Sequence, residues 1–294
     1  MTPPVSAARL SESVQQTPLQ PVRALTAGLV APPALHSRAR PAALSVLLRL
    51  SVPLLILALW AAGTARGFIP ANVLAPPLVV LETAWQLATS GVLWHHLSIS
   101  LTRALTGLVI GGGAGLVLGA LAGLHKVGEE LIDPTAQMVR AIPFLALVPL
   151  FIVWFGIGEV SKVLLIAAAA AKPMYLNAYG GIRNADHKLL EAGLVFGMTP
   201  LQRLRDIYWP AALPSLMVGL RLAMTLSLIA LIAVEVINTS QGIGFLMLQA
   251  QEFFQTEILL VCMVIYALFG LGSDLLVRFL EWLLMPWRRQ GAYR

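Results

Sequence analysis

Three charged residues lie inside apolar blocks of the sequence that are long enough to cross a membrane: Lys172, Arg221 and Glu235. Charged side chains at membrane depth usually face a cavity or a partner, so Lys172 is a candidate contact for an anionic solute. Arg221 follows Pro214 by only seven residues, so its long side chain could instead extend to the lipid head groups. For Glu235, near the end of its block, we expect a structural hydrogen bond.

Other kinds of chemistry have no residues to perform them. The sequence contains no Gly-Lys dipeptide, so the phosphate loop that would bind ATP is missing. It has no His-Glu-x-x-His spacing, and the adjacent His95 and His96 do not share a helix face. The single Cys262 allows neither a disulfide nor a cysteine metal site. We therefore expect no catalytic residue, no metal and no cofactor, and ATP hydrolysis only on a separate subunit.

The composition indicates what kind of protein holds these residues. Of 294 residues, 58% are hydrophobic and only 12% are charged, whereas a soluble domain has about a quarter charged residues. A net charge of +6 is expected for a membrane protein that retains Lys and Arg on the cytoplasmic side. No basic run with interleaved aromatic residues is present, so the bilayer and not nucleic acid is the expected partner.

The apolar blocks predict an all-α polytopic membrane protein with about six transmembrane helices. They lie near residues 44–63, 101–124, 138–155, 160–180, 211–238 and 258–284. The connections on one side carry most of the Lys and Arg, for example Lys126, Arg183 and Lys188, whereas the opposite connection 239–257 has none. This asymmetry predicts that both termini are cytoplasmic, in a multi-pass protein of the bacterial inner membrane.

Three regions are expected along the chain. Residues 1–42 contain seven prolines and no apolar period, which is typical of a disordered cytoplasmic tail; an organelle transit peptide is the alternative. Residues 43–100 hold the first transmembrane helix and an external segment, in which an amphipathic interfacial helix is expected after Pro77. Residues 101–290 form the core.

The second predicted helix carries a glycine at every fourth position. These residues, Gly107, Gly111, Gly115, Gly119 and Gly123, share one helical ridge. Without side chains on that ridge, another helix can approach closely. Tight helix packing is the main interpretation, and a sliding surface for a moving neighbour is the alternative.

Prolines interrupt the next two helices. Pro143 and Pro149 lie in the third block and Pro173 lies in the fourth, and each removes a backbone hydrogen bond and should kink its helix. Broken helices are tolerated in a membrane where they are buried or line a cavity. We therefore expect Pro143 and Pro149, with Lys172 and Arg221, to be candidates for residues that line a pathway. A plain structural kink is the alternative.

The connection 181–210 has signals for two short helices outside the bilayer. Asp186 is a good N-cap for a helix over 187–196, and Gly197 is a good C-terminal stop. Thr199 and Pro200 then provide a cap and a first-turn proline for a second helix, which we expect to run to Trp209 and to bend at Pro210. Such a rigid projection could dock on a partner and transmit force.

This connection resembles the EAA loop of ABC importer permease subunits. The matching positions are Glu191, Ala192, Gly193, Gly197, Ile207 and Pro210. Gly193 replaces the second Ala of the family's pattern, and Trp209 stands where Leu is usual. The runs from Arg140 to Pro149 and from Trp154 to Glu159 resemble the sulfonate, taurine and nitrate branch, and 242–257 is most similar to aliphatic-sulfonate permeases. Lys172 departs from that branch, where an apolar or aromatic residue is commoner.

The resemblance implies a two-copy membrane pathway with defined partners. The loop, including Thr199, would dock into a cytoplasmic ABC ATPase subunit, and an extracytoplasmic solute-binding protein would deliver the solute. A second copy of the chain would complete the pathway on a two-fold axis. The implied solute is a small organic anion, in the first place an aliphatic sulfonate, with taurine or nitrate as alternatives. A self-sufficient secondary transporter is a weaker alternative, because no internal repeat is evident.

Overall fold

The computed structural model describes residues 42–237 and 239–287, with side chains from Ser51 onward. The predicted tail therefore lies outside the described residues, except for Ala42. The chain divides into two units, residues 1–54 and 55–294. Of the first unit, the structure describes only the beginning of helix α1 (Ala42–Ala65). All other elements belong to the second unit.

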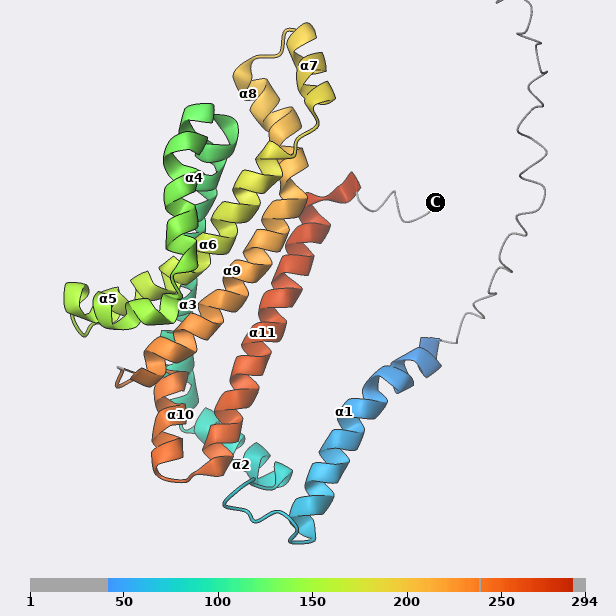
Figure 1. Ribbon diagram of the computed structural model, residues 1–294. Helices are drawn as coiled ribbons and strands as arrows, with labels where there is room; N and C mark the ends of the chain where they lie inside the picture. Colours follow the sequence, from blue (N-terminus) through green and yellow to red (C-terminus); the bar gives the residue numbers. More distant parts are fainter. Residues whose placement is uncertain (1–41, 238, 288–294) are drawn as a thin grey trace, which may run out of the picture. The chain divides into compact units, whose positions relative to one another are not determined.

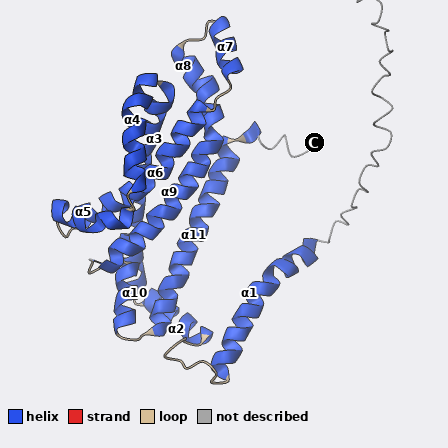
Figure 2. Ribbon diagram, viewed as in Figure 1, coloured by secondary structure: helices blue, strands red, loops and turns tan. Residues whose placement is uncertain are grey.

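Every regular element in the described part of the chain is helical, as the sequence predicts (Figures 1 and 2). After α1 the elements are α2 (Pro77–Thr89), α3 (Val92–Leu124), α4 (Lys126–Ala141), the 3-10 turn η3 (Phe144–Leu147), α5 (Val148–Phe155), α6 (Glu159–Arg183), α7 (His187–Val195), α8 (Pro200–Arg203), the π turn η4 (Leu204–Tyr208), α9 (Trp209–Ile237), α10 (Ile243–Glu252) and α11 (Thr256–Leu284).

Three described helical runs are long and apolar enough to cross a membrane on their own: Val92–Leu124, Pro200–Ile237 and Thr256–Leu284. The pair formed by Lys126–Ala141 and Phe144–Phe155 passes the same test only when it is taken together. Helices α1 and α6 cover the predicted first and fourth spans. The number of six spans remains a prediction.

The predicted break of the 138–155 span is confirmed at Pro143, whereas the predicted start of that span and a break at Pro149 are wrong. Helix α4 begins at Lys126 and ends at Ala141, and the chain turns by 88° before it continues as η3 and α5. Pro143 directly precedes η3, and its ring cannot continue the hydrogen bonds of α4. Pro149 lies in the first turn of α5, where a proline is well tolerated. The two prolines thus start new segments instead of kinking one helix.

Pro173, by contrast, does not break the fourth helix. Helix α6 runs from Glu159 to Arg183 with Pro173 inside it. The Nδ2 atom of Asn177 donates to the Pro173 carbonyl oxygen at 2.8 Å. This extra hydrogen bond lies on the helical turn that follows the proline, so α6 remains one continuous helix that can position Lys172 next to α4.

The glycine ridge of α3 packs directly on α6. A Cβ atom at Gly107 would lie 2.6 Å from a side-chain carbon of Ile166, and one at Gly119 would lie 2.5 Å from the Tyr175 carbonyl oxygen. At Gly111 it would overlap the carbonyl group of Ala167. Such distances are shorter than van der Waals contact, so only glycine permits this helix spacing. The interpretation as tight helix packing is confirmed.

Helix α2 is the helix expected after Pro77. Val80 is buried in a cluster with Ala75, Ile243 and Cys262, whereas Leu81 and other large apolar residues of α2 are exposed. The Nε1 atom of Trp60 donates to the Ala75 carbonyl at 3.1 Å and fixes the segment before α2. Helix α2 therefore presents one apolar face to the protein and another to its surroundings.

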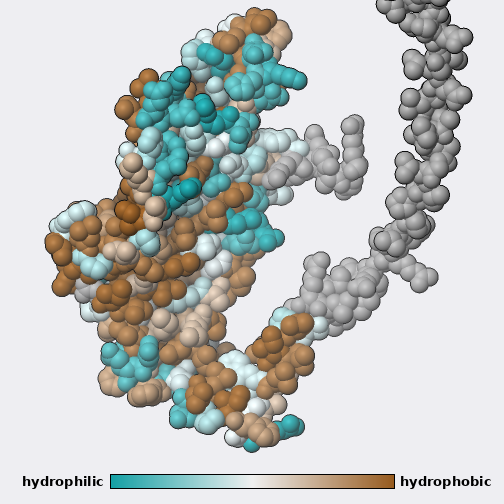
Figure 3. Space-filling model, viewed as in Figure 1, coloured by the Kyte–Doolittle hydropathy of each residue, from teal (hydrophilic) through white to brown (hydrophobic). Residues whose placement is uncertain are grey.

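The surface of the second unit changes character along the helices. In Figure 3, hydrophilic residues gather over α4, α7 and α8, whereas hydrophobic residues cover α5 and the neighbouring middle part. Helix α11 in particular exposes Leu268, Leu271 and Leu275. Contiguous exposed apolar surface of this kind is expected where lipid replaces water as the surrounding medium.

Candidate functional site

The first half of the 181–210 connection folds as the sequence predicts. The side chain of Asp186 accepts a hydrogen bond from the Lys188 amide at 2.9 Å and caps α7. Gly197 follows the helix with a φ of 72°, a left-handed conformation that glycine adopts without strain. The Met198 amide then donates to the Gly193 carbonyl at 2.9 Å and closes the end of α7.

The second half differs from its prediction. Thr199 and Gln202 form the expected cap, since the Gln202 amide donates to Thr199 Oγ1 and the Thr199 amide to Gln202 Oε1. The helix does not end at Trp209, however, and α8, η4 and α9 form one run from Pro200 to Ile237. The π turn directly before Trp209 widens the helix where Pro210 lacks an N–H group. The second predicted helix is therefore the start of the fifth predicted span.

Two residues of the family pattern meet inside this connection. Gly193 is buried, and a Cβ atom there would lie 3.0 Å from Ile207 Cδ1 and 3.1 Å from Met198 Sδ. The glycine at this position thus lets α7 lie close against the side chain of Ile207. Glu191 is exposed and Ala192 is half-buried. The pattern consequently combines residues that hold two helices together with residues that are free to contact a partner.

The end of α7 exposes an apolar patch, which we call the α7 patch. It consists of Leu194, Val195, Phe196 and Leu201, and both Val195 and Phe196 are 84% exposed. This patch lies at the end of the unit where the surface is otherwise mainly hydrophilic (Figure 3). An exposed apolar patch rimmed by polar residues commonly marks a contact surface for another protein.

Lys172 lies beside the break between α4 and η3. Its Nζ atom donates a hydrogen bond to the Ile142 carbonyl at 2.5 Å. Ile142 immediately precedes Pro143, and the next turn closes instead through the Ala146 amide and the Pro143 carbonyl. Lys172 therefore satisfies a carbonyl group that the helix break leaves without a backbone partner.

A cavity of about 400 Å³ separates α4 from α3 and α6 on the side of Lys172. Its wall is mainly apolar and includes Leu118, Ile132, Val139 and Leu176. Arg140 and Lys172 are the two cations that line it. We call this space the Lys172 cavity. Pro149 does not line it, so the four predicted pathway residues do not converge on one site.

Arg221 lies elsewhere and is paired. Its guanidinium is 3.3 Å from carboxylate oxygens of both Asp274 and Glu281 on α11. Two carboxylates next to one guanidinium give the arginine a structural role between α9 and α11. The side chain does not need to extend to lipid head groups for its charge to be balanced.

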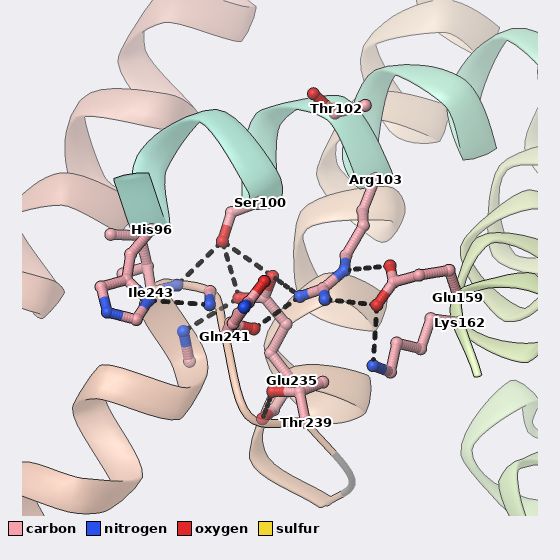
Figure 4. A network of polar contacts seen from close by, with 12 residues as sticks. His96, Ser100, Thr102, Arg103, Glu159, Lys162, Glu235, Thr239, Gln241 and Ile243 are labelled. Atoms are coloured by element: carbon pink, nitrogen blue, oxygen red, sulfur yellow. Dashed lines mark hydrogen bonds and ion pairs between the residues drawn. The ribbon is translucent and has the colours of Figure 1, made fainter. Parts of the chain in front are cut away.

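A buried network of charges joins α3, α6 and α9, and the sequence interpretation missed it (Figure 4). Arg103 is 4% exposed. Its Nε and Nη2 atoms each donate to a carboxylate oxygen of Glu159 at 2.6 Å, and its Nη1 atom donates to Glu235 at 2.8 Å. Lys162 Nζ donates to Glu159 at 3.0 Å. The Glu159 side chain is 60% exposed, whereas the other three are buried; the two cations and two carboxylates balance, so the buried charges are compensated. We call this group the Arg103 network.

The Arg103 network also fixes the start of α10. The amides of Gly242, Ile243 and Gly244 donate to His96 Nδ1, Ser100 Oγ and Glu235 Oε2, at 3.0, 2.8 and 2.9 Å. These are first-turn amides of a helix, which have no partner within it. The expected structural hydrogen bond of Glu235 is thus confirmed. His96 belongs to the network, and no group of three potential metal ligands was found in the described part of the chain.

The Arg103 network could have been found from one signal. Arg103 and Glu235 are the first and last charges of their predicted helices, and a buried arginine requires an acid. Their separation of 132 positions in the sequence hides this pairing. Glu159 ends the run from Trp154, which indicates a family resemblance but gives no sign that its carboxylate pairs with Arg103.

Comparisons with known proteins agree with this architecture. Residues 115–283 match the family described as the binding-protein-dependent transport system inner membrane component. The aliphatic sulfonates transport permease protein SsuC of Bacillus subtilis strain 168 is 40% identical over 81% of this chain and 87% of its own length. SsuC of Escherichia coli K12 is 41% identical over 80% of this chain and 90% of its own length. The taurine transport system permease protein TauC of Escherichia coli K12 is 32% identical over 86% of this chain and 95% of its own length.

A solved structure shows the same fold. A chain of a crystal structure described as an amino acid ABC transporter with histidines aligns with a TM-score of 0.51 at 20% identity, over 63% of this chain and 91% of that chain. The family match covers more than half of the 294 residues, and the relatives cover about four fifths. The chain belongs to the family of inner membrane components of binding-protein-dependent transport systems, the permease subunits of ABC importers.

Proposed function

We propose that this permease moves aliphatic sulfonates into the cytoplasm. The observation that carries the proposal is its 40% and 41% identity, over about four fifths of the chain, to two aliphatic sulfonates transport permeases. The taurine permease is 32% identical, so taurine, which is itself a sulfonate, is the second candidate. Lys172 beside a mainly apolar cavity supports an organic anion as the solute, because such a solute needs both a cation and an apolar wall.

Lys and Arg are concentrated on the side of the α7 connection, which supports an orientation with both termini in the cytoplasm. In this orientation Glu191 and the α7 patch face the ATPase subunit, and the α10 end faces the solute-binding protein. Deletion of residues 2–40 should change transport little. A second copy of the chain completes the pathway, as closed symmetry favours for a single kind of subunit. Of the candidate pathway residues Pro143, Pro149, Lys172 and Arg221, we keep Lys172, because it lines a cavity, whereas Arg221 is paired with two carboxylates and the two prolines start η3 and α5.

Growth of a deletion strain tests the solute. Cells that lack the gene are supplied with hexanesulfonate, taurine or sulfate as the only sulfur source, and with nitrate as the only nitrogen source. We expect loss of growth on hexanesulfonate alone, restored by the gene. Loss on taurine or nitrate alone would assign the permease to that solute instead.

A charge reversal tests the docking loop. Glu191→Arg should abolish uptake at normal membrane abundance, because the exposed carboxylate is then replaced by a cation in the contact with the ATPase. Glu82→Arg, at an exposed position of α2, is the matched control and should leave uptake unchanged. Normal uptake by Glu191→Arg at equal abundance would contradict the docking role.

A further inference from the structure

The two cations that line the Lys172 cavity, Arg140 and Lys172, have no acidic partner in the described part of the chain. Lys172 has one hydrogen bond, to the Ile142 carbonyl, and Arg140 has neither an ion pair nor a side-chain hydrogen bond there. The other cations that lie between long helices are paired: Arg103 with two carboxylates, Lys162 with one and Arg221 with two. Lys172 is half-buried and Arg140 is exposed, and an unpaired cation at membrane depth usually faces an anion or water.

The two cations lie at the same end of the cavity. Arg140 is on the last turn of α4, and Lys172 bonds to the carbonyl two residues beyond it. From there the lining residues of α4 continue back to Leu131, about 14 Å along the helix at 1.5 Å per residue. Within this stretch Tyr175, which also lines the cavity, donates from Oη to Asp133 at 3.0 Å, and beyond it Tyr179 Oη donates to Glu129 at 2.6 Å. The cavity thus has a cationic end followed by a long apolar wall.

Lys172 also has hydrogen-bonding capacity left for a ligand. An ammonium group carries three N–H donors, and the Ile142 carbonyl accepts one of them. Two donors therefore remain, and the guanidinium of Arg140 adds more. A group with several acceptor oxygens and a negative charge suits this arrangement, and hydrogen bonds between charged groups are the strong ones.

We propose that the Lys172 cavity is the solute subsite of each permease subunit and that it selects anions with an aliphatic chain. Lys172 and Arg140 hold the sulfonate group, and the chain lies along Ile132, Val139 and Leu176. The subsite rests on the proposed sulfonate function and deepens it for this chain: because Lys172 departs from the sulfonate branch, the subsite is a feature of this permease and not of the branch. Its volume of about 400 Å³ lies within the usual range for small-molecule sites.

An anionic lipid would offer the same chemistry, but the composition of α4 favours a soluble solute. This helix carries Glu129, Glu130, Asp133 and Gln137 besides its two terminal cations. Figure 3 likewise shows hydrophilic residues over α4. A helix bathed in lipid tails would not carry this number of charged groups, so α4 borders an aqueous path through which a solute reaches the cavity.

Transport assays on the complete importer test the subsite. The permease, its ATPase and its binding protein are reconstituted in vesicles, and uptake of methane-, butane- and hexanesulfonate is compared. Lys172→Gln and Arg140→Gln should each lower uptake of all three about tenfold or more, because a charged hydrogen bond is lost. Lys172→Arg should retain most of it. Lys126→Gln, on the first turn of α4, is the control and should match the unaltered protein.

A cavity-filling variant tests the apolar wall separately. Ala136 lines the cavity, and Ala136→Phe should lower hexanesulfonate uptake at least tenfold more than methanesulfonate uptake. In the unaltered permease, free of binding protein, hexanesulfonate should raise the unfolding temperature, whereas nitrate should not. Lys172→Gln should abolish that rise, and its own unfolding temperature without solute reports whether it has folded.

The outcomes separate the two proposals. If the unaltered importer takes up no sulfonate, the proposed function fails. If it takes up sulfonates and Lys172→Gln does so equally well at equal abundance, the subsite is wrong and the function stands. A phospholipid that co-purifies with the unaltered permease but not with Lys172→Gln, with uptake unchanged in the variant, would overturn the subsite and assign the cavity to lipid. If Ala136→Phe lowered the uptake of methane-, butane- and hexanesulfonate equally, the proposed selection of solutes by chain length would be wrong.

Discussion

Helix α6 carries two charged regions that differ in one respect. At its beginning, Glu159 and Lys162 belong to the Arg103 network, in which every charge has an opposite partner within 3.0 Å. Near its middle, Lys172 and the neighbouring Arg140 have no carboxylate partner among the described residues. Complete pairing is what a structural role needs, and missing pairing at membrane depth is what a ligand site needs. If the proposed subsite is correct, the first region serves stability and the second, formed by Lys172 on α6 and Arg140 on α4, serves transport.

The largest expected effect is the loss of the buried arginine. Arg103→Met should lower the free energy of unfolding by about 3–5 kcal/mol, because Glu235 then remains as a buried carboxylate without its cation. Thermal unfolding of the purified protein in detergent measures this. The double variant Arg103→Met, Glu235→Gln should recover part of the loss. A loss no larger than that of Arg140→Gln would remove the distinction between the two regions.

The next effect concerns the helix contact that positions both regions. Gly111→Ala should destabilise the protein by about 1–3 kcal/mol, since the added methyl overlaps the Ala167 carbonyl group of α6. Gly113→Ala, on the same helix, is the matched control, because a Cβ atom at Gly113 would meet no atom within 4 Å. It should stabilise α3 slightly, by up to about 1 kcal/mol. Equal unfolding temperatures for the two variants would show that α3 and α6 tolerate a wider spacing.

A smaller change in stability is expected at the unpaired cation. Lys172→Met removes one hydrogen bond, to the Ile142 carbonyl, and should cost about 1 kcal/mol. Its unfolding curve should therefore lie much closer to that of the unaltered protein than the curve of Arg103→Met does. A loss of several kcal/mol would mean that Lys172 stabilises the helix break and is no freer than Arg103.

The smallest effect is expected outside the apolar blocks, in the α7 connection. Gly193→Ala gains helix propensity of up to about 1 kcal/mol, but the added methyl lies 3.0 Å from Ile207 Cδ1 and 3.1 Å from Met198 Sδ. Both atoms are ends of flexible side chains, so the two terms should nearly cancel. Unfolding temperature and uptake should both stay close to those of the unaltered protein. A large drop in uptake alone would show that the spacing of α7 matters for docking.

Local signals account for what could be predicted from the sequence. Five of the six apolar blocks predicted from the sequence each correspond to a single helix of the structure. Helix α3, however, begins at Val92, well before the predicted start at 101. Caps at Asp186 and Thr199 and the stop at Gly197 were read correctly because each acts within a few residues. The glycine ridge was equally legible, since its spacing is a property of one helix.

What could not be predicted depends on contacts between distant segments. Arg103 and Glu159 are 56 positions apart, and no local pattern reports that they meet. The break at Ile142 was expected from Pro143, but its angle of 88° was not, because a proline has the same sequence signal in a mild kink and in a right-angled turn. Pro173 shows the reverse error, since α6 continues through it. Neighbouring helices decide whether a proline ends a helix or is accommodated within it.

The uninterrupted run from Pro200 to Ile237 has a mechanical consequence. A helix of 38 residues is about 57 Å long at 1.5 Å per residue. It begins at the cap next to the α7 patch and reaches Glu235, which holds the first turn of α10. We therefore expect this helix to transmit a displacement from α7 to α10, and the π turn over Leu204–Tyr208 is the place where it can bend. Bending there would reduce the displacement that reaches α10.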